Sequence, residues 1–231
     1  MAARSFRKTH PTSNNITTSE RRSAEDVQKV NGLAQIRRLD QLPNAYRQGQ
    51  LDALCGVYSV INACRFMMKS TGLRKNLGAW ELLVAIVNML EEKRKFADIT
   101  CNGMRFRDHD RMLDTAKRFL LGKHGLVLEV RKPLVKLRHP TAKQAFRMAK
   151  DHLANSGAAV FLSFETEQYG HWTVISTIAD GKVSFFDSTG LRPKPIADFR
   201  LTPDPDQPLK KKFEFRKSGM VFVQLSTAGP S

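Results

Sequence analysis

Three side chains of the types that carry acyl-transfer chemistry occur in the order Cys55, His171, Asp187. A cysteine attacks a carbonyl as its thiolate, and the partial positive charge at a helix N-terminus stabilises that form. Cys55 stands at the start of a segment with helical apolar spacing, and the small Gly56 after it keeps the thiol accessible. The pattern therefore predicts Cys55 as a nucleophile, with Gly56 bordering the substrate site.

The second candidate, His171, opens a predicted strand in the run Gly170-His171-Trp172. An imidazole titrates near neutral pH, so it can serve as the general base for a thiol. The Asp-Gly pair at 180–181 indicates a hairpin, which brings Asp187 on the next strand beside His171. A carboxylate there would orient the ring. Because Asp187 follows two phenylalanines, we expect it to be buried, and a buried charge without a partner is costly. We expect Gly170 and Trp172 to border the substrate.

A glutamine precedes the nucleophile and could donate to a developing oxyanion beside the backbone N–H of Cys55. Gln50 lies five residues ahead of Cys55, and Gln48 lies seven residues ahead. The shorter connection favours Gln50, and Gln48 remains the competing candidate.

The elements that must position these residues follow from periodicity. Apolar residues recur at helical spacing in four segments and alternate in five others. The predicted helices are 55–68, 78–95, 108–121 and 141–156, and the predicted strands are 125–130, 158–164, 171–179, 182–188 and 219–226. Helices come first and an antiparallel sheet follows, so the expected fold class is α+β, with the nucleophile helix packed centrally on the sheet.

Composition predicts one domain. Residues 1–24 offer almost nothing apolar to bury and are expected to form a flexible basic tail, whose composition also resembles a transit peptide or secretion signal. Residues 25–231 are expected to form a single catalytic domain. The segments 98–107 and the Pro-rich 190–212 are the expected loops and cleft walls.

The motifs resemble those of the papain-like cysteine peptidases. The run QLDALCGVYSVINA (50–63) is similar to their nucleophile motif, and GHWTV (170–174) with FDS (186–188) to their base strand and orienting residue. Within that group, Josephin-type deubiquitinases and bacteriocin-leader-processing peptidases look most similar. The chain departs from the first by having Asp187 in place of Asn, and from the second by a Gln-to-Cys spacing one residue shorter. The resemblance implies a papain-like fold and a Cys-His-Asp triad.

Two kinds of function follow from these motifs. The first is a thiol peptidase or isopeptidase acting on a peptide or protein; the alternative on the same triad is a transglutaminase or glutamine deamidase. No cofactor is expected. A third hypothesis, without catalysis, is a basic module that binds nucleic acid or an acidic partner, because the formal net charge is +16 and residues 131–150 hold seven basic and no acidic side chains.

The remaining composition limits the location and the kind of site. Three cysteines in a chain of 231 residues argue against a disulfide framework and favour a reducing, cytoplasmic compartment. No Cys/His cluster has zinc-ligand spacing, so no metal site is expected, and Asp108-His109-Asp110 is interpreted as a helix start. No apolar stretch is long enough for a membrane-spanning helix.

Overall fold

The computed structural model describes residues 44–47, 53–72, 76–93, 95–202 and 213–227. Residues Leu42–Ser231 form one compact unit. The predictions for the tail 1–24, for the domain start at 25 and for Gln48 and Gln50 fall outside the described residues.

The described elements fall into five α-helices, three short 3-10 helices and eight strands. The α-helices are α2 (Cys55–Ser70), α3 (Ala79–Glu92), α4 (Phe96–Asn102), α5 (Phe106–His124) and α6 (Ala142–Leu153). The strands are β1 (Leu126–Arg131), β2 (Ala158–Glu165), β3 (Gly170–Ala179), β4 (Lys182–Phe185), β5 (Lys194–Pro195), β6 (Phe199–Leu201), β7 (Phe213–Phe215) and β8 (Met220–Thr227). The 3-10 helices are η1 (Pro133–Lys136), η2 (Ile196–Asp198) and η3 (Lys217–Gly219).

All four predicted helices and all five predicted strands are present, and the differences lie in short elements. Helix α4 occupies a segment that was predicted to be a loop, and β5, β6 and β7 were not predicted as separate strands. Each of these three strands has two or three residues, which is too short for alternation to reveal. The segment 190–202 therefore carries more regular structure than its proline content suggests.

The sheet is mostly antiparallel. Its strand order is β1-β8-β2-β3-β4-β5, with β7 pairing to β2, and β6 pairing to β7. Every neighbouring pair runs antiparallel except β6 and β7, which are parallel. Helices followed by this sheet confirm the α+β class.

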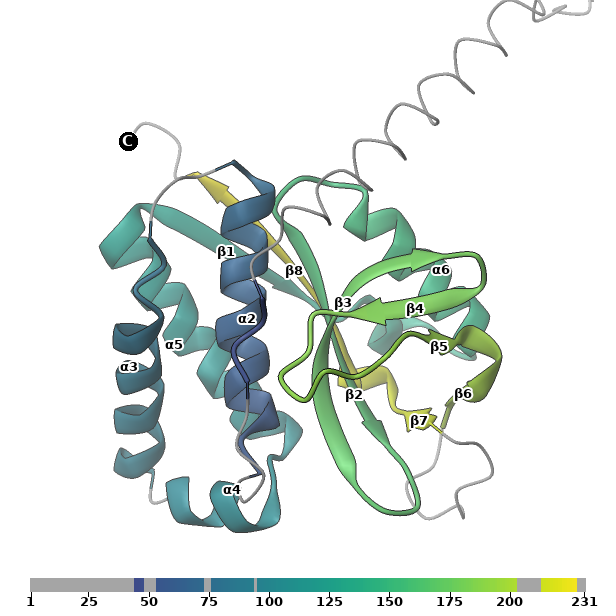
Figure 1. Cartoon of the computed structure of the whole chain (residues 1–231), viewed down its shortest axis with the longest axis horizontal. Coiled ribbons are helices and arrows are strands. Elements are labelled where there is room, and N and C mark those ends of the chain that lie inside the picture. The colour runs from purple at the N-terminus through teal and green to yellow at the C-terminus, as the bar shows by residue number, and fades with distance from the viewer. Residues whose placement is uncertain (1–43, 48–52, 73–75, 94, 203–212, 228–231) are drawn as a thin grey trace, which may run out of the picture. The chain divides into compact units, whose positions relative to one another are not determined.

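Each face of the sheet carries its own apolar core, because successive strand side chains point to opposite faces. In β2, Ala159 and Phe161 join α2, α3 and α5 in one core. Val160, Leu162 and Phe164 join α6 and the strands β6 and β7 in the other. Figure 1 shows this division: α2 to α5 gather on the left of the sheet, and α6 lies on the right behind β4.

Helix α2 is the central element of the first core. Twelve of its residues are buried, and it packs against β2, β3, α3 and α5. Its first residue is Cys55, and the N-cap position is occupied by Leu54, which has no side-chain oxygen to bond the first-turn N–H groups. No side-chain cap is therefore present at this end of α2 among the described residues.

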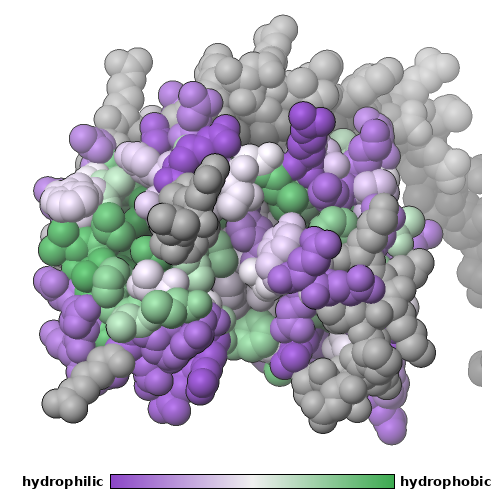
Figure 2. Space-filling view, turned by 60° about the horizontal axis from the view of Figure 1, so that its bottom comes forward, coloured by the Kyte–Doolittle hydropathy of each residue, from purple (hydrophilic) through white to green (hydrophobic). Residues whose placement is uncertain are grey.

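The outer surface of α3 carries exposed apolar side chains, with Trp80 73% and Val84 38% exposed. In Figure 2 hydrophobic residues gather toward the left of the view, the side on which Figure 1 places α3. Among the described residues, no helix combines the length and the apolar character that crossing a membrane requires.

Candidate active site

The thiol of Cys55 lies in a cleft of about 760 Å³. Cys55 is 7% exposed, and its Sγ lies 4.0 Å from the carbonyl oxygen of Ala53. The start of α2 forms one side of this cleft, and residues of β2 and β3 form the other. Cys55 thus begins a helix, as the sequence predicts, and lines a cleft.

Strand β3 places His171 across the cleft from α2. His171 pairs with Phe164 of β2 and is 6% exposed. Its Nε2 lies 2.7 Å from Oδ2 of Asp187, and both side chains are buried. The predicted pairing of His171 with Asp187 is therefore present as a buried hydrogen bond.

The hairpin that brings these two residues together turns at residues 180–181, as predicted. Asp180 and Gly181 both have positive φ, 50° and 70°, which suits a two-residue hairpin turn. The prediction that the second strand runs over 182–188 is wrong at its end, because β4 ends at Phe185 and the ladder shifts register between Ile175 and Thr177. Asp187 consequently lies in the turn that follows β4. The alternation of side chains along the strand therefore does not set the direction of its carboxylate.

The two oxygens of Asp187 have separate tasks. Oδ1 accepts hydrogen bonds from Thr189 N at 2.8 Å, Thr189 Oγ1 at 2.6 Å and Leu191 N at 3.1 Å. Oδ2 is left to face His171. The hydrogen bonds from the turn after β4 hold the carboxylate in place, and the carboxylate then orients the imidazole.

Electrostatics favour an imidazolium at this position. Burial of the ring opposes protonation and is the largest single effect, but the hydrogen bonds and charges of Asp187 and Cys55 outweigh it and raise the pKa of His171 to about 9. Burial also opposes ionisation of Asp187, yet the hydrogen bond and charge of His171 hold the pKa of the carboxyl below its usual range. Near neutral pH the pair is therefore an imidazolium–carboxylate pair.

Cys55 is the partner on the other side of the ring. Its side chain is near enough to the ring to contribute to the raised pKa of His171. Because Asp187 occupies Nε2, the nitrogen left for the sulfur is Nδ1. The imidazole of His171 thus lies between a thiol and a carboxylate.

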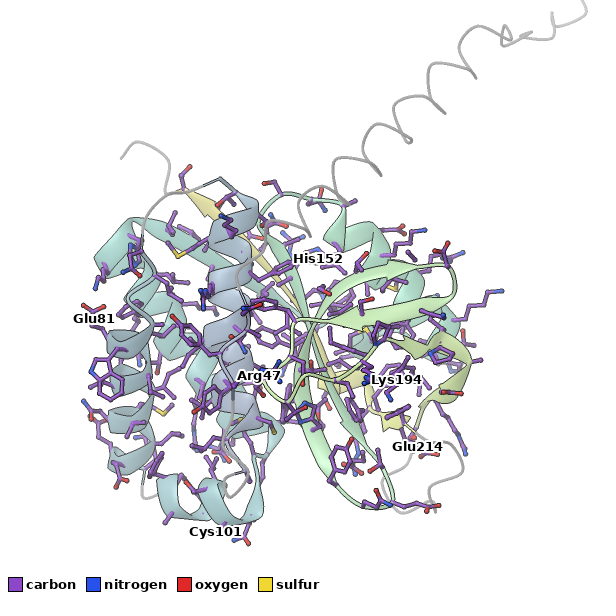
Figure 3. The ribbon with its side chains drawn as sticks, viewed as in Figure 1. Arg47, Glu81, Cys101, His152, Lys194 and Glu214 are labelled. Carbon is purple, nitrogen blue, oxygen red and sulfur yellow. The ribbon has the colours of Figure 1, made fainter. Side chains whose placement is uncertain are left out.

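The other two cysteines lie in different environments. Cys64, on the same helix, is 1% exposed, and burial raises the pKa of its thiol to about 12. Cys101 is exposed at the end of α4, where Figure 3 shows it at the edge of the molecule. Only Cys55 has an imidazole beside it among the described cysteines.

The cleft walls include residues to which the sequence assigned no role. Residues 102–106 line one side, in agreement with the predicted wall at 98–107, whereas the other predicted wall contributes nothing to this cleft in its described part, 190–202. Tyr169 lines the opposite side, and Arg216 pairs with Glu165 at 3.6 Å. These side chains come from α4, α5, β2 and the segments around them.

The predicted substrate-bordering residues take different positions. Gly170 and Trp172 line the cleft. Gly56 lies beneath Met104, because a Cβ at Gly56 would stand 2.4 Å from the Met104 Cε atom. Gly56 is not among the residues that line the cleft; its small size lets the Met104 side chain pack directly onto the start of α2.

Trp172 is held by an unpredicted stack. The ring of His109 lies parallel to it, with centroids 3.8 Å apart, and the edge of Phe106 meets it at 5.6 Å. His109 has zero exposure, and burial, with the charge of Lys132, lowers its pKa to about 3. Helix α5 starts at Phe106, two residues before the start predicted at Asp108, and Asp108 lies in its first turn, bonded to Arg111 at 2.9 Å. The neutral His109 ring fixes the indole of Trp172 next to His171.

The segment before Cys55 is anchored by α2 itself. Asn62, on α2, accepts from Tyr46 N at 2.8 Å and donates to Tyr46 O at 3.2 Å. Arg65 lies 4.5 Å above the Tyr46 ring, and Arg47 reaches Gly190, in the turn that follows Asp187. Figure 3 shows Arg47 between α2 and the strands. The chain leading to the oxyanion candidates thus starts from a fixed point.

Part of the predicted basic stretch is neutralised by the fold. Arg131 bonds Glu129 at 2.5 Å, and Lys132 bonds both carboxylate oxygens of Asp110 at 2.6 and 2.7 Å. The basic block at 131–150 therefore carries fewer unpaired charges than its sequence suggests.

In the part of the chain that the structure describes, no group of three His, Cys, Asp or Glu side chains is arranged to hold a metal ion. Comparison of the chain with protein-family models, with curated proteins and with solved structures found no match.

Proposed function

We propose that this protein is a cysteine peptidase or isopeptidase that acts on a peptide or protein through Cys55, His171 and Asp187. The observation that supports it most is the buried 2.7 Å contact of His171 with Asp187, on a ring that also interacts with the thiol at the start of α2. A nucleophile and a base that line one cleft, with a buried carboxylate bonded to the base, constitute the triad arrangement.

The proposed reaction has two halves. The Cys55 thiolate attacks the carbonyl carbon, and the charge that develops on oxygen faces the first-turn N–H groups of α2 and the predicted donor Gln50. The His171 imidazolium then gives its proton to the leaving amine as the carbon–nitrogen bond breaks, which leaves a thioester. Water attacks the thioester, His171 accepts its proton, and the thiol leaves with the acid product released.

The finer fold assignment belongs to the same proposal. A helix that begins at the nucleophile and packs on the strand of the base agrees with the papain-like resemblance of residues 50–63 and 170–174. The alternative, transfer of a glutamine side-chain acyl group, uses the same triad. The two reactions differ in their products, so a product analysis separates them.

A substrate trap tests the proposal. Cys55→Ala removes the sulfur and leaves the cleft lining otherwise intact, so the tagged variant should retain substrates from a native cell extract. Cys64→Ala, a buried cysteine on the same helix, is the matched control and should retain no more than the wild type.

Captured proteins are then incubated with the wild type and analysed by mass spectrometry. New chain termini or a released isopeptide-linked protein would support the peptidase. Conversion of glutamine to glutamate, or a cross-link formed with loss of ammonia, would support the alternative. If the wild type changes none of the captured proteins and Cys55→Ala captures no more than Cys64→Ala, the proposed function is wrong.

A further inference from the structure

A second hollow lies far from the cleft, between α6 and the hairpin of β3 and β4. This groove has a volume of about 620 Å³. Its apolar lining includes the exposed Ala179 and the partly exposed Ile196, together with the buried Phe146 and Ile178. Ile178 is seven residues along β3 from His171, which corresponds to roughly 23 Å of strand. An occupant of this groove would leave the cleft open. Helix α6 packs against β3 here, and Figure 1 shows it behind β4 of the hairpin.

One side of the groove is a row of cations on α6. Lys143, Arg147 and Lys150 all line it and are all exposed. Steps of four and three residues place them on one face of the helix. None of the three forms an ion pair with a carboxylate of the described residues. In this respect they differ from Arg131 and Lys132, whose charges are matched within the fold.

We propose that this groove binds an acidic, amphipathic segment of another protein. Ala179 and Ile196 offer apolar contact to leucine-like side chains, and carboxylates spaced along the segment meet the three cations of α6. The chain's formal net charge of +16 adds long-range attraction for such a partner. The groove is a docking surface, separate from the cleft, and does not depend on the proposed catalytic function.

The groove's chemistry favours a protein segment over a nucleic acid. Single strands are held by aromatic side chains on which bases stack, and the only aromatic residue among the lining residues, Phe146, is fully buried. Asp180 also lines the groove, on the side of the hairpin. A continuous phosphate chain would meet that carboxylate, whereas an amphipathic segment can direct its acidic face to α6 alone.

Fluorescence anisotropy at physiological salt tests the proposal with a labelled amphipathic peptide of glutamate and leucine. A scrambled peptide of the same composition is the ligand control. The double variant Lys143→Glu/Arg147→Glu should weaken binding about tenfold or more, since each reversal replaces an attraction with a repulsion. Lys69→Glu/Lys93→Glu makes the same change of net charge at exposed sites elsewhere and should weaken it far less.

Amide chemical-shift mapping on the wild-type protein locates the peptide without a variant and should mark α6 and residues 178–181. Equal weakening by the two double variants, or equal binding of the two peptides, would reduce the effect to net charge and overturn the proposal. Tighter binding of a single-stranded RNA, with the same dependence on Lys143 and Arg147, would overturn it in favour of a nucleic-acid site.

Discussion

Replacing Asp187 with Asn should make the His171 imidazolium much less stable. The pKa of His171 is raised from 6.5 to about 9 although burial opposes the charge. A shift of this size corresponds to about 3 kcal/mol in favour of the imidazolium. Asn keeps an oxygen that can accept the hydrogen bond from Nε2 but removes the negative charge, so the midpoint should fall by about two pH units.

Histidine-selective ¹³C NMR over pH 5 to 11 measures this midpoint, since this range extends about two pH units beyond the expected values. The His171 resonance is identified by its loss in His171→Ala. Asp180→Asn makes the same chemical change at the far end of the hairpin and should leave the midpoint unchanged. A wild-type midpoint near 6.5, or an Asp187→Asn midpoint equal to that of the wild type, would refute the reasoning.

The raised pKa of His171 also makes the stability of the fold depend on pH. The folded pKa of His171 lies above its ordinary value, so its contribution is fully present below about pH 6.5 and is lost as pH rises through about 9. If the function proposed here is right, turnover should also fall along this limb, because the leaving amine needs the imidazolium proton.

Three further predictions concern residues around the triad. His109→Phe should make the free energy of unfolding depend less on pH in the acid range. The pKa of His109 is lowered to about 3, so the wild type loses up to about 5 kcal/mol of stability as pH falls from 6.5 to 3. Urea unfolding at several pH values measures this loss in both proteins. Asn62→Ala leaves both backbone groups of Tyr46 without their partner and should lower the free energy of unfolding by about 1–3 kcal/mol; an unchanged urea midpoint would contradict the anchor. Gln50→Ala should lower kcat by about 10²–10³-fold at similar KM, and Gln48→Ala should be nearly silent; the reverse ranking in steady-state kinetics would assign the oxyanion donor to Gln48.

The sequence predicted the elements that depend on local periodicity and turn chemistry. The Asp-Gly pair at 180–181 identified the hairpin, and helical spacing after Cys55 identified α2. Counting residues out from the turn brought His171 near Asp187, although β4 stops at Phe185 and a register shift intervenes. The contact survives because Asp187 lies in a turn whose amides hold its other oxygen.

The rest depends on tertiary packing that no local pattern encodes. Met104 over Gly56 and His109 on Trp172 join residues that lie 48 and 63 positions apart in the chain. In the sequence, His109 stands in a run typical of a helix start, and nothing in that run predicts a buried ring stack. The distribution of charge over 131–150 likewise depends on Asp110, which the fold brings to Lys132 from α5.

The central claim is that Cys55 is activated by His171, and competitive alkylation tests it most directly. Brief treatment of the intact protein with iodoacetamide, followed by peptide mapping, compares the three cysteines at neutral pH. Exposure alone predicts that Cys101 reacts first, since Cys55 is only 7% exposed. We predict that Cys55 reacts fastest and that His171→Ala slows its labelling while that of Cys101 stays the same. Faster labelling of Cys101, with Cys55 indifferent to His171→Ala, would contradict the claim.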